Sequence, residues 1–501
     1  MNKITDNLLN QSKKTVLVFG GKVITSLFGY VNLVLLARIL NPSSFGYYNI
    51  ALSYVLIFSV LGVFGLDKLI VKYVPVWEEG NNEEFRHKVN NILSFVIYVA
   101  IGVVFVYLFI IYLLDPGHIE IFFIMSLSVF FNSLSIFFRA FNQSINKHIH
   151  AVIPEDYIRP TLYFFILFGL YFIYGENSNS EILVALSYTI TFFVVFVTAV
   201  ILFSRNLKLI GVNFCFEFKP QLNKDLIKYA IINMGNNILN QNKMQILIII
   251  SGILVASKVV GFVSLGIKTA SLISFVLIAI NMVLSPIISR LYNKNYFEQL
   301  NHYYILSVKI LLSIGGLVSI WLIINSEVLF NLFGYENNSL VLVIFIFSVG
   351  EIINISFGSV GYLLIMTGYS YINLKINILS NLIVILCLLL LYNYESIGIS
   401  VSYSLGLSLV NLIGFYFVYY RLQLNPFSRF HLAFMISFFI NILLFLMTER
   451  DLSIYNLLAS NLVAFFIHFT LLLVIGCTKE EKNSLRKILI RLRILGGDQI
   501  K

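Results

Sequence analysis

Long apolar stretches separated by short polar breaks recur along the whole chain. Two of them, residues 91–114 and 182–204, contain no charged side chain. Each exceeds the roughly 20 apolar residues that a helix needs to cross the hydrocarbon core of a membrane. The pattern therefore predicts an integral membrane protein built from α-helices.

The apolar stretches give about fourteen predicted membrane-spanning helices. They lie at approximately residues 15–38, 46–66, 91–114, 120–143, 157–174, 182–204, 228–254, 259–286, 303–325, 339–364, 372–392, 397–420, 430–447 and 453–476. We therefore expect an all-α integral membrane fold of two six-helix lobes related as parallel repeats, followed by two C-terminal helices. The expected parts are a first lobe at 1–204, a basic cytoplasmic linker at 205–227, a second lobe at 228–420, two additional helices at 421–478 and a basic amphipathic tail at 479–501.

The distribution of basic side chains predicts how the chain crosses the membrane, because loops that face the cytoplasm are enriched in Lys and Arg. With the N-terminus in the cytoplasm, 27 of the 34 Lys and Arg residues fall in cytoplasmic segments, and four fall within spans: Lys22, Lys243, Lys268 and Lys309. Arg38, Lys258 and Arg450 fall on the outside. A missed helix would destroy this asymmetry, so we expect an even number of spans and both termini in the cytoplasm.

Two similar turns indicate an internal repeat. The first predicted helix ends in ILNPSSFGYY (39–48) and the seventh ends in ILVASKVVGFV (253–263), each with a Gly where the next helix begins. Because an even number of helices separates the turns, both halves would have the same orientation, as in transporters built from parallel repeats. Substrate sites of such transporters lie between the repeats near mid-membrane. A chance match of short apolar turns is the alternative.

Composition supports a membrane protein and removes several other classes. The chain is 59% hydrophobic and 12% charged, whereas soluble domains are about half apolar and about a quarter charged. In so apolar a chain a net charge of +10 reflects basic cytoplasmic loops, so we expect no nucleic-acid partner. The three cysteines lack metal-site spacing, and the sequence has no GxxxxGK[ST] phosphate loop. We therefore expect no enzyme activity, no cofactor and no metal site.

A polar stripe in the seventh predicted helix indicates a water-filled cavity. The stripe consists of Asn233, Asn236, Asn240 and Lys243. Their spacing of 3, 4 and 3 residues places them on one face of a helix. A lysine that faces lipid at this depth costs on the order of 3 kcal/mol, so the stripe is expected to face a cavity. Hydrogen bonding between packed helices is the alternative.

Other predicted helices carry further ionisable or polar candidates. The first helix repeats the spacing from Lys22 to Asn32, although Lys22 lies near enough to the cytoplasmic end to snorkel out of the membrane. The eighth helix carries Lys268, and the tenth carries Glu351 near mid-membrane. We expect Glu351 to bind H⁺ or Na⁺ or to pair with a buried lysine, since acids inside membranes are generally functional.

Two arginines extend this set. Arg139 lies in the fourth helix on a weaker stripe with Asn132, and Arg159 opens the fifth helix. Anchoring at the inner membrane boundary is the alternative for both arginines. Taken together, the basic candidates outnumber the single glutamate. A cationic pocket inside a membrane indicates an anionic substrate, with phosphate as the obvious class.

Two short motifs resemble a known family. LLARILNPSSFGYYNIALS (35–53) contains a Leu-x-Pro-x-x-Phe-Gly-x-Tyr turn, and LGVFGLDKLIVKYVP (61–75) contains Gly-Leu followed by a basic amphipathic segment. The matching positions are Leu40, Pro42, Phe45, Gly46, Tyr48, Gly65, Leu66, Lys68 and Lys72. In these motifs the chain is similar to polysaccharide flippases of the multidrug/oligosaccharidyl-lipid/polysaccharide exporter superfamily.

The resemblance implies two six-helix lobes that form a V, two extra helices and alternating access. It also implies a flippase that moves a polyprenyl-diphosphate-linked oligosaccharide from the inner to the outer leaflet of a bacterial or archaeal plasma membrane. Membrane lipids, H⁺ or Na⁺, and glycan polymerases or glycosyltransferases would be its partners. By analogy with related flippases, Lys22, Lys243 and Lys268 would hold the diphosphate.

Two other functions stay open on the sequence. An ion-coupled multidrug antiporter of the same superfamily would need an anionic cavity, and the first helix lacks the aspartate of many such exporters. The chain also departs from the lipid II flippase branch, whose first helix carries more than one arginine in the cavity. A membrane glycan polymerase or ligase would need a large external loop, whereas the external loops here are short.

Overall fold

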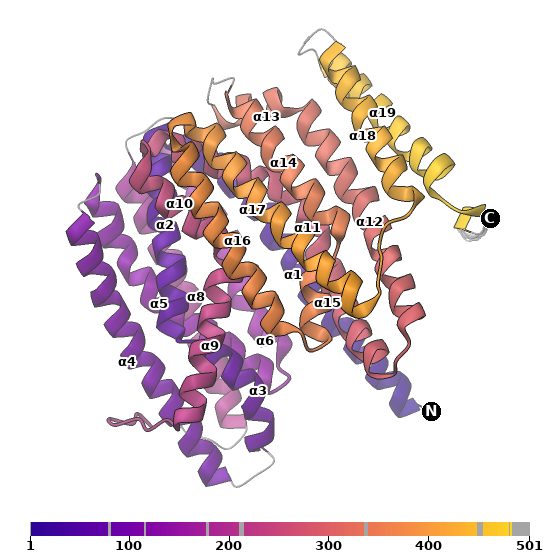
Figure 1. Cartoon of the computed structure of the whole chain (residues 1–501). Coiled ribbons are helices and arrows are strands. Elements are labelled where there is room, and N and C mark those ends of the chain that lie inside the picture. The colour runs from indigo at the N-terminus through magenta and orange to yellow at the C-terminus, as the bar shows by residue number, and fades with distance from the viewer. Residues whose placement is uncertain are drawn as a thin grey trace, which may run out of the picture. The chain divides into compact units, whose positions relative to one another are not determined.

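The structure is a computed structural model that describes residues 2–78, 82–114, 117–176, 180–209, 215–334, 339–447, 454–479 and 481–482. All regular secondary structure in these residues is helical (Figure 1). The first part of the chain forms α1 (Asn2–Ile39), α2 (Pro42–Val63), α3 (Leu66–Glu78), α4 (Asn82–Leu114), α5 (Ile119–Ser144), α6 (His148–Val152), the π-helical turn η1 (Ile153–Ile158), α7 (Arg159–Tyr174), α8 (Glu181–Leu209), α9 (Lys224–Gln241) and α10 (Lys243–Leu254). The second part forms α11 (Ser257–Asn293), α12 (Phe297–Ile324), α13 (Ser326–Phe333), α14 (Ser339–Phe357), α15 (Val360–Met366), α16 (Ser370–Leu391), η2 (Tyr392–Tyr394), α17 (Glu395–Phe417), η3 (Val418–Leu422), α18 (Arg429–Met447), α19 (Ile454–Leu471) and η4 (Leu472–Gly476).

Among the described residues, 11 helical segments are long and apolar enough to cross a membrane. One of them, Ser370–Leu422, contains two helices, α16 and α17, joined by the short turn η2. Two shorter apolar helices, Lys243–Leu254 and Arg429–Phe445, coincide with further predicted spans. The described helices therefore account for all of the predicted spans, and the prediction of an all-α membrane protein is confirmed.

The span predicted at 228–254 is interrupted. Helix α9 ends at Gln241, Asn242 has backbone angles of φ −110° and ψ 20°, and α10 begins at Lys243. Asn242 donates a hydrogen bond from Nδ2 to the backbone oxygen of Asn237 at 3.2 Å, which caps the break. The expectation of one continuous polar helix face from 233 to 243 is therefore wrong, because the helical spacing does not carry through Asn242.

Packing divides the described helices into two compact units. The first unit contains the described residues up to Leu265 with two short additions, Leu332–Tyr335 and Leu388–Ile399, and the second contains the remaining residues from Gly266. This division follows contacts rather than repeats, so the predicted lobes and the linker at 205–227 stay a prediction. The amphipathic helix predicted for the tail at 479–501 lies almost entirely outside the described residues.

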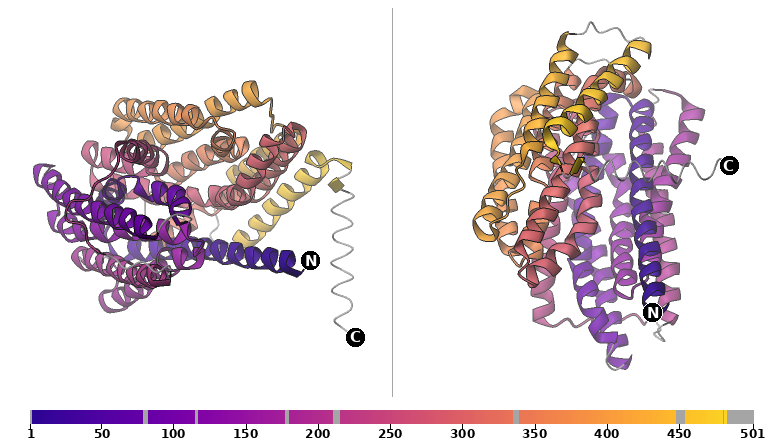
Figure 2. Two further views of the ribbon diagram at one scale, coloured as in Figure 1. Left: turned by 90° about the horizontal axis from the view of Figure 1, so that it is seen from below. Right: turned by 90° about the vertical axis from the view of Figure 1, so that its right-hand side faces the viewer.

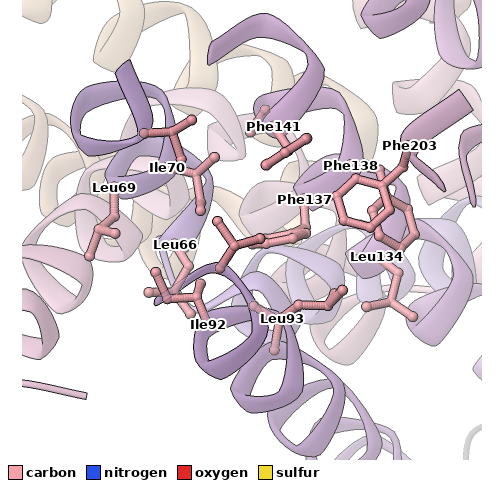
Figure 3. Close-up of a cluster of buried hydrophobic side chains, with 14 of the residues drawn as sticks. Leu66, Leu69, Ile70, Ile92, Leu93, Leu134, Phe137, Phe138, Phe141 and Phe203 are labelled. Atoms are coloured by element: carbon pink, nitrogen blue, oxygen red, sulfur yellow. The ribbon is translucent and has the colours of Figure 1, made fainter. Parts of the chain in front are cut away.

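The first unit is built around α5. Helices α2, α4 and α8 all pack against it (Figure 1). Apolar side chains of α3, α4, α5 and α8 fill the space between these helices (Figure 3). The ring of Phe203 on α8 lies 4.6 Å from that of Phe138 and 4.8 Å from that of Phe141 on α5, measured between centroids. Since lipid is as apolar as these side chains, close packing of this kind is what holds membrane helices together.

The two similar turns of the sequence pack against each other within the first unit. A methyl group on Gly46 would lie 1.8 Å from the carbonyl oxygen of Ser257, and one on Gly261 would lie 2.7 Å from the carbonyl oxygen of Pro42. Each turn therefore needs glycine where it meets the other. This reciprocal contact fits the predicted parallel repeat, because a two-fold axis between repeats brings equivalent turns together.

In the second unit, α18 and α19 lie beside each other and pack on α12 (Figure 2). The side-chain amides of Asn325 and Asn461 exchange hydrogen bonds of 2.8 and 3.0 Å between α12 and α19. Lys309 on α12 donates to the carboxylate of Glu481 at 2.6 Å. Such polar bonds fix helices that lipid alone would leave weakly held.

Candidate substrate-binding site

A polar cavity of about 490 Å³ lies in the first unit. Its charged lining residues are Lys22, Lys68, Arg139, Arg159, Asp67 and Glu155. Its uncharged polar lining residues are Asn132, Gln143, Asn237, Asn242 and Gln245. Basic groups outnumber acidic ones in this lining, so the cavity attracts anions. The lining comes from α1, α2, α3, α5, η1, α7, α9, α10 and the break before α10.

Arg139 on α5 is the centre of an ion-pair network in the cavity wall. Its Nη1 donates to Glu155 Oε2 at 2.5 Å, and its Nη2 donates to Asp156 Oδ2 at 2.9 Å. Lys22 Nζ on α1 donates to Asp156 Oδ1 at 3.0 Å. A buried charge without a partner costs several kcal/mol, so the mutual pairing is what allows these groups to lie among apolar helices.

A wide helical turn presents two carboxylates to one arginine. Glu155 and Asp156 lie in η1, where the helix that runs from α6 to α7 widens into a π-helical turn. Pro154 explains the widening, because proline has no N–H to donate and its ring hinders the carbonyl group one turn earlier. Turns of this kind are frequent at functional sites. Here the turn lets two consecutive side chains both reach Arg139.

Helix α1 lies close against this turn. A methyl group on Gly21 would lie 2.8 Å from the ring of Tyr157, and Thr25 Oγ1 donates to the backbone oxygen of Asp156 at 2.9 Å. Lys22 lies between these two contacts, and its ammonium group is bonded to Asp156. The lysine side chain still lines the cavity, with 32% of its surface exposed.

Asp67 and Asn237 join α3 to α9 in another part of the wall. Asn237 Nδ2 donates to Asp67 Oδ2 at 3.4 Å, and Lys68 Nζ lies 3.5 Å from the same oxygen. Gly65 makes the approach possible, since its φ of +71° suits glycine and a methyl group there would lie 2.1 Å from the carbonyl oxygen of Ala230. These contacts hold the N-terminal end of α3, with Asp67 and Lys68, at the cavity.

The predicted asparagine stripe lies mostly away from this cavity. Asn233 is half-buried and donates to the backbone one turn earlier at 2.7 Å, Asn236 is half-buried, and Lys243 is buried. None of these three lines the cavity in the part of the chain that the structure describes. The side chain of Asn240 lies outside the described residues. Asn237, which the stripe omits, is the asparagine of α9 that reaches the cavity.

Three other predicted site residues have different surroundings. Asn32 is buried and donates from Nδ2 to a backbone oxygen of α7 at 3.0 Å, which is a bond between packed helices. Lys268 is half-buried and Glu351 is buried, both in the second unit. The carboxylate of Glu351 accepts a hydrogen bond from Asn354 Nδ2 at 3.1 Å. Binding by Asn32 and Lys268 and ion coupling by Glu351 stay predictions.

The sequence does not predict the acidic residues of the site. Asp67, Glu155 and Asp156 lie beside the ends of predicted spans, where charged residues are ordinary. The available signal is the segment IPEDYIRP (153–160), in which a proline and two acids directly precede Arg159 at a span boundary. In the structure, one cavity is lined by Lys22, Arg139 and Arg159 together with two of these acids, Asp67 and Glu155. The third acid, Asp156, is next to Glu155 in the sequence.

This lining offers two kinds of hydrogen-bond donor. Guanidinium and ammonium groups bind phosphate oxygens through charge-assisted hydrogen bonds. The amides of Asn132, Gln143 and Gln245 offer both donors and acceptors to hydroxyl groups. The arrangement suits a ligand that carries phosphate together with sugar.

Comparison with known proteins defines the family. Residues 12–292, more than half of the chain, match the family described as polysaccharide biosynthesis protein. The chain belongs to this family. Residues 234–393 of this polysaccharide biosynthesis protein also match the MatE family. No curated protein sequence matches the chain.

Solved structures similar to this polysaccharide biosynthesis protein are membrane transporters. The lipid II flippase MurJ in an inward closed conformation is 15% identical with a TM-score of 0.68, and the match covers 91% of this chain and 98% of that chain. An inward-facing multidrug resistance MATE family transporter of the MOP superfamily is 11% identical with a TM-score of 0.63, covering 82% and 98%. A MOP superfamily transporter from Pyrococcus furiosus, described with a binding pocket of reverse polarity, is 11% identical with a TM-score of 0.57, covering 82% and 94%. The likeness shows that the chain has the fold of this transporter superfamily.

Proposed function

We propose that this protein is a flippase that moves a polyprenyl-diphosphate-linked oligosaccharide from the inner to the outer leaflet of the plasma membrane, for assembly of a surface polysaccharide. The observation that carries the proposal is a cavity lined by Lys22, Lys68, Arg139 and Arg159 in a member of the polysaccharide biosynthesis protein family. The lining holds four basic and two acidic side chains, and this excess of positive charge favours a negatively charged ligand.

In the proposed mechanism the diphosphate and the sugars cross inside the protein while the lipid tail stays in the bilayer. The basic lining residues hold the two phosphates, and the amides hydrogen-bond the sugar hydroxyls. Alternating access then opens the cavity to one leaflet at a time. Outward movement of a negative charge is favoured in a cell with an inside-negative potential, by about 2.3 kcal/mol per charge per 100 mV. Lys243 and Lys268 remain proposed additional contacts, and Glu351 remains a proposed H⁺ or Na⁺ site.

The test compares two lysines of one helix. Lys68 lines the cavity, whereas Lys72 is directed at the ring of Tyr229, 4.4 Å from its centroid. In a strain that lacks the chromosomal gene, we expect Lys68→Gln to lower export of the lipid-linked glycan about tenfold, because one charge-assisted hydrogen bond to phosphate is lost. The matched control Lys72→Gln should export normally. Export is measured with a lectin that cannot cross the membrane.

Two results would contradict the proposal. The first is a deletion strain in which no lipid-linked glycan accumulates on the cytoplasmic side. The second is normal export by both lysine variants.

A multidrug antiporter of the same superfamily is the second candidate, and the match of residues 234–393 to the MatE family favours it. The buried Glu351 would then couple drug efflux to H⁺ or Na⁺. In that case deletion would lower tolerance to cationic drugs without accumulation of lipid-linked glycan. Glu351→Gln would have the same effect as deletion.

A further inference from the structure

The ion-pair network in the cavity wall balances its own charge. Two cations, Lys22 and Arg139, face two carboxylates, Glu155 and Asp156. Each carboxylate contacts Arg139, and Asp156 also contacts Lys22. Both cations of this network are therefore already paired before any substrate arrives.

The two signs of charge differ in how far they reach the cavity. The side chains of Lys22 and Arg139 are 32% and 21% exposed, whereas those of Glu155 and Asp156 are 10% and 2% exposed. Lys22, Arg139 and Glu155 thus line the cavity, with the two cations the more exposed, whereas Asp156 does not line it. The backbone of Asp156 is held by the hydrogen bond from Thr25, whereas Lys22 and Arg139 have the longer and more exposed side chains.

A substrate diphosphate has the same charge as this pair of carboxylates. A diphosphate esterified at both ends, to a lipid and to a sugar, carries two negative charges at neutral pH. Carboxylate and phosphate oxygens bind guanidinium groups with the same forked geometry. The protein's own acids and the substrate therefore attract the same two side chains.

We propose that Glu155 and Asp156 act as an internal counter-anion that competes with the substrate diphosphate for Lys22 and Arg139. This inference rests on the proposed flippase function and adds the residues that limit affinity. When the substrate binds, the two cations are shared with or turned toward its phosphates. When it leaves, they return to the carboxylates, so release at the outer leaflet does not leave two charges unpaired.

The proposed role of Glu155 and Asp156 differs from that of residues that bind the substrate. It also differs from that of an ion pair that only stabilises the fold. Turnover of a transporter requires substrate release as well as substrate binding, so a site with very high affinity slows transport. Weakening the counter-anion should therefore tighten binding and slow transport. A purely structural pairing would instead weaken binding and lower the stability of the fold.

The test measures binding of a synthetic farnesyl-diphosphate-linked monosaccharide to the full-length protein in nanodiscs at 150 mM salt. We expect Asp156→Asn to lower the Kd about tenfold, because a like charge near the phosphates is removed. Flipping of the same probe in vesicles should become slower. Asp225→Asn removes an exposed carboxylate at the start of α9 and should leave both quantities unchanged.

A second variant covers the case in which Asp156→Asn does not fold. Glu155 has one buried carboxylate oxygen with no hydrogen-bond partner among the described residues, so Glu155→Gln disturbs few existing contacts. It keeps the shape of the side chain and an oxygen that can accept from Arg139, and it should lower the Kd in the same direction as Asp156→Asn.

The outcomes separate the two proposals. Absence of probe binding to the wild-type protein would overturn the flippase itself. Wild-type binding that is unchanged or weakened in both Glu155→Gln and Asp156→Asn would overturn the counter-anion alone.

Discussion

Asp156 joins three helical segments through one carboxylate and one backbone carbonyl group. Its carboxylate accepts from Lys22 on α1 and Arg139 on α5, while its own place is in η1. The two cations can be predicted from the sequence, because a charge inside a long apolar stretch stands out. Asp156 cannot, since it lies in a polar break where acids are common and where the partner depends on tertiary contacts.

The asparagines of α9 show the same limit of prediction from sequence. Asn233 and Asn236 follow helical spacing, yet it is Asn237 that contacts Asp67. Periodicity gives the face of a helix, but the rotation of that face toward a neighbour depends on packing. At this position the packing is set by the close approach of α9 to Gly65.

At the residue scale, the tight approach at Gly65 can be tested by adding one methyl group. Gly65→Ala should lower the free energy of unfolding by about 2–3 kcal/mol, because the new methyl meets the Ala230 carbonyl and a positive φ disfavours alanine. Gly102→Ala is the matched control, because nothing lies within 4 Å of its added methyl group. It should be neutral or stabilising by less than about 1 kcal/mol. Thermal unfolding in detergent measures both variants, and equal effects would contradict the close approach.

Among the elements, hydropathy predicts where helices are but not where they are broken. The predicted spans recur as helices, whereas the break at Asn242 and the wide turn η1 do not follow from apolar content. A window long enough to detect a membrane span averages over one or two irregular residues. Pro154 is the exception, because proline lacks a backbone N–H group and therefore predicts an irregular helix at its position.

The ion pair between Lys309 on α12 and Glu481, which follows η4, predicts a pH effect. Burial opposes ionisation of Glu481, but hydrogen bonds from Lys309 and Thr478 outweigh it and lower the pKa of this carboxyl below its ordinary value of 4.5. A lowered pKa means that the stabilisation is complete above pH 4.5 and is lost as the pH falls through the value in the folded protein. Glu481→Gln should therefore cost about 0.5 kcal/mol at pH 7, since the group is partly exposed.

The cost of that variant should vanish in acid. The difference in melting temperature between Glu481→Gln and the wild type should shrink as the pH falls below 4.5. Glu298→Gln, at the exposed start of α12, serves as the control and should match the wild type throughout. A constant difference across the pH range would mean that the Lys309–Glu481 pair is not what holds the chain end.

For the whole molecule, the fold class and the family follow from the sequence because they depend on many residues at once. The long apolar stretches and the turn around Gly46 give the same answer as the family match and the solved structures. The orientation in the membrane is a different kind of property. It depends on charges in the connecting loops rather than on the packing of helices, and it stays a prediction.

Cys215 gives a direct measure of that orientation. It is exposed and lies in the connection predicted to face the cytoplasm. With Cys387 and Cys477 replaced by alanine, a membrane-impermeant maleimide should label Cys215 in inverted vesicles and not in intact cells. Ser43→Cys in a variant without native cysteines, at an exposed position predicted to face outward, should show the opposite pattern. Labelling of Cys215 in intact cells would reverse the assignment.

The paired glycine turns have a mechanical consequence. Gly46 and Gly261 let two stretches of backbone touch with no side chain between them, at the ends of helices that the sequence marks as equivalent. In the proposed alternating-access cycle, a contact this close would serve as a pivot for the helices that meet there. A side chain at either glycine would force the two turns apart, so such a variant is expected to lower export while the cavity lining is unchanged.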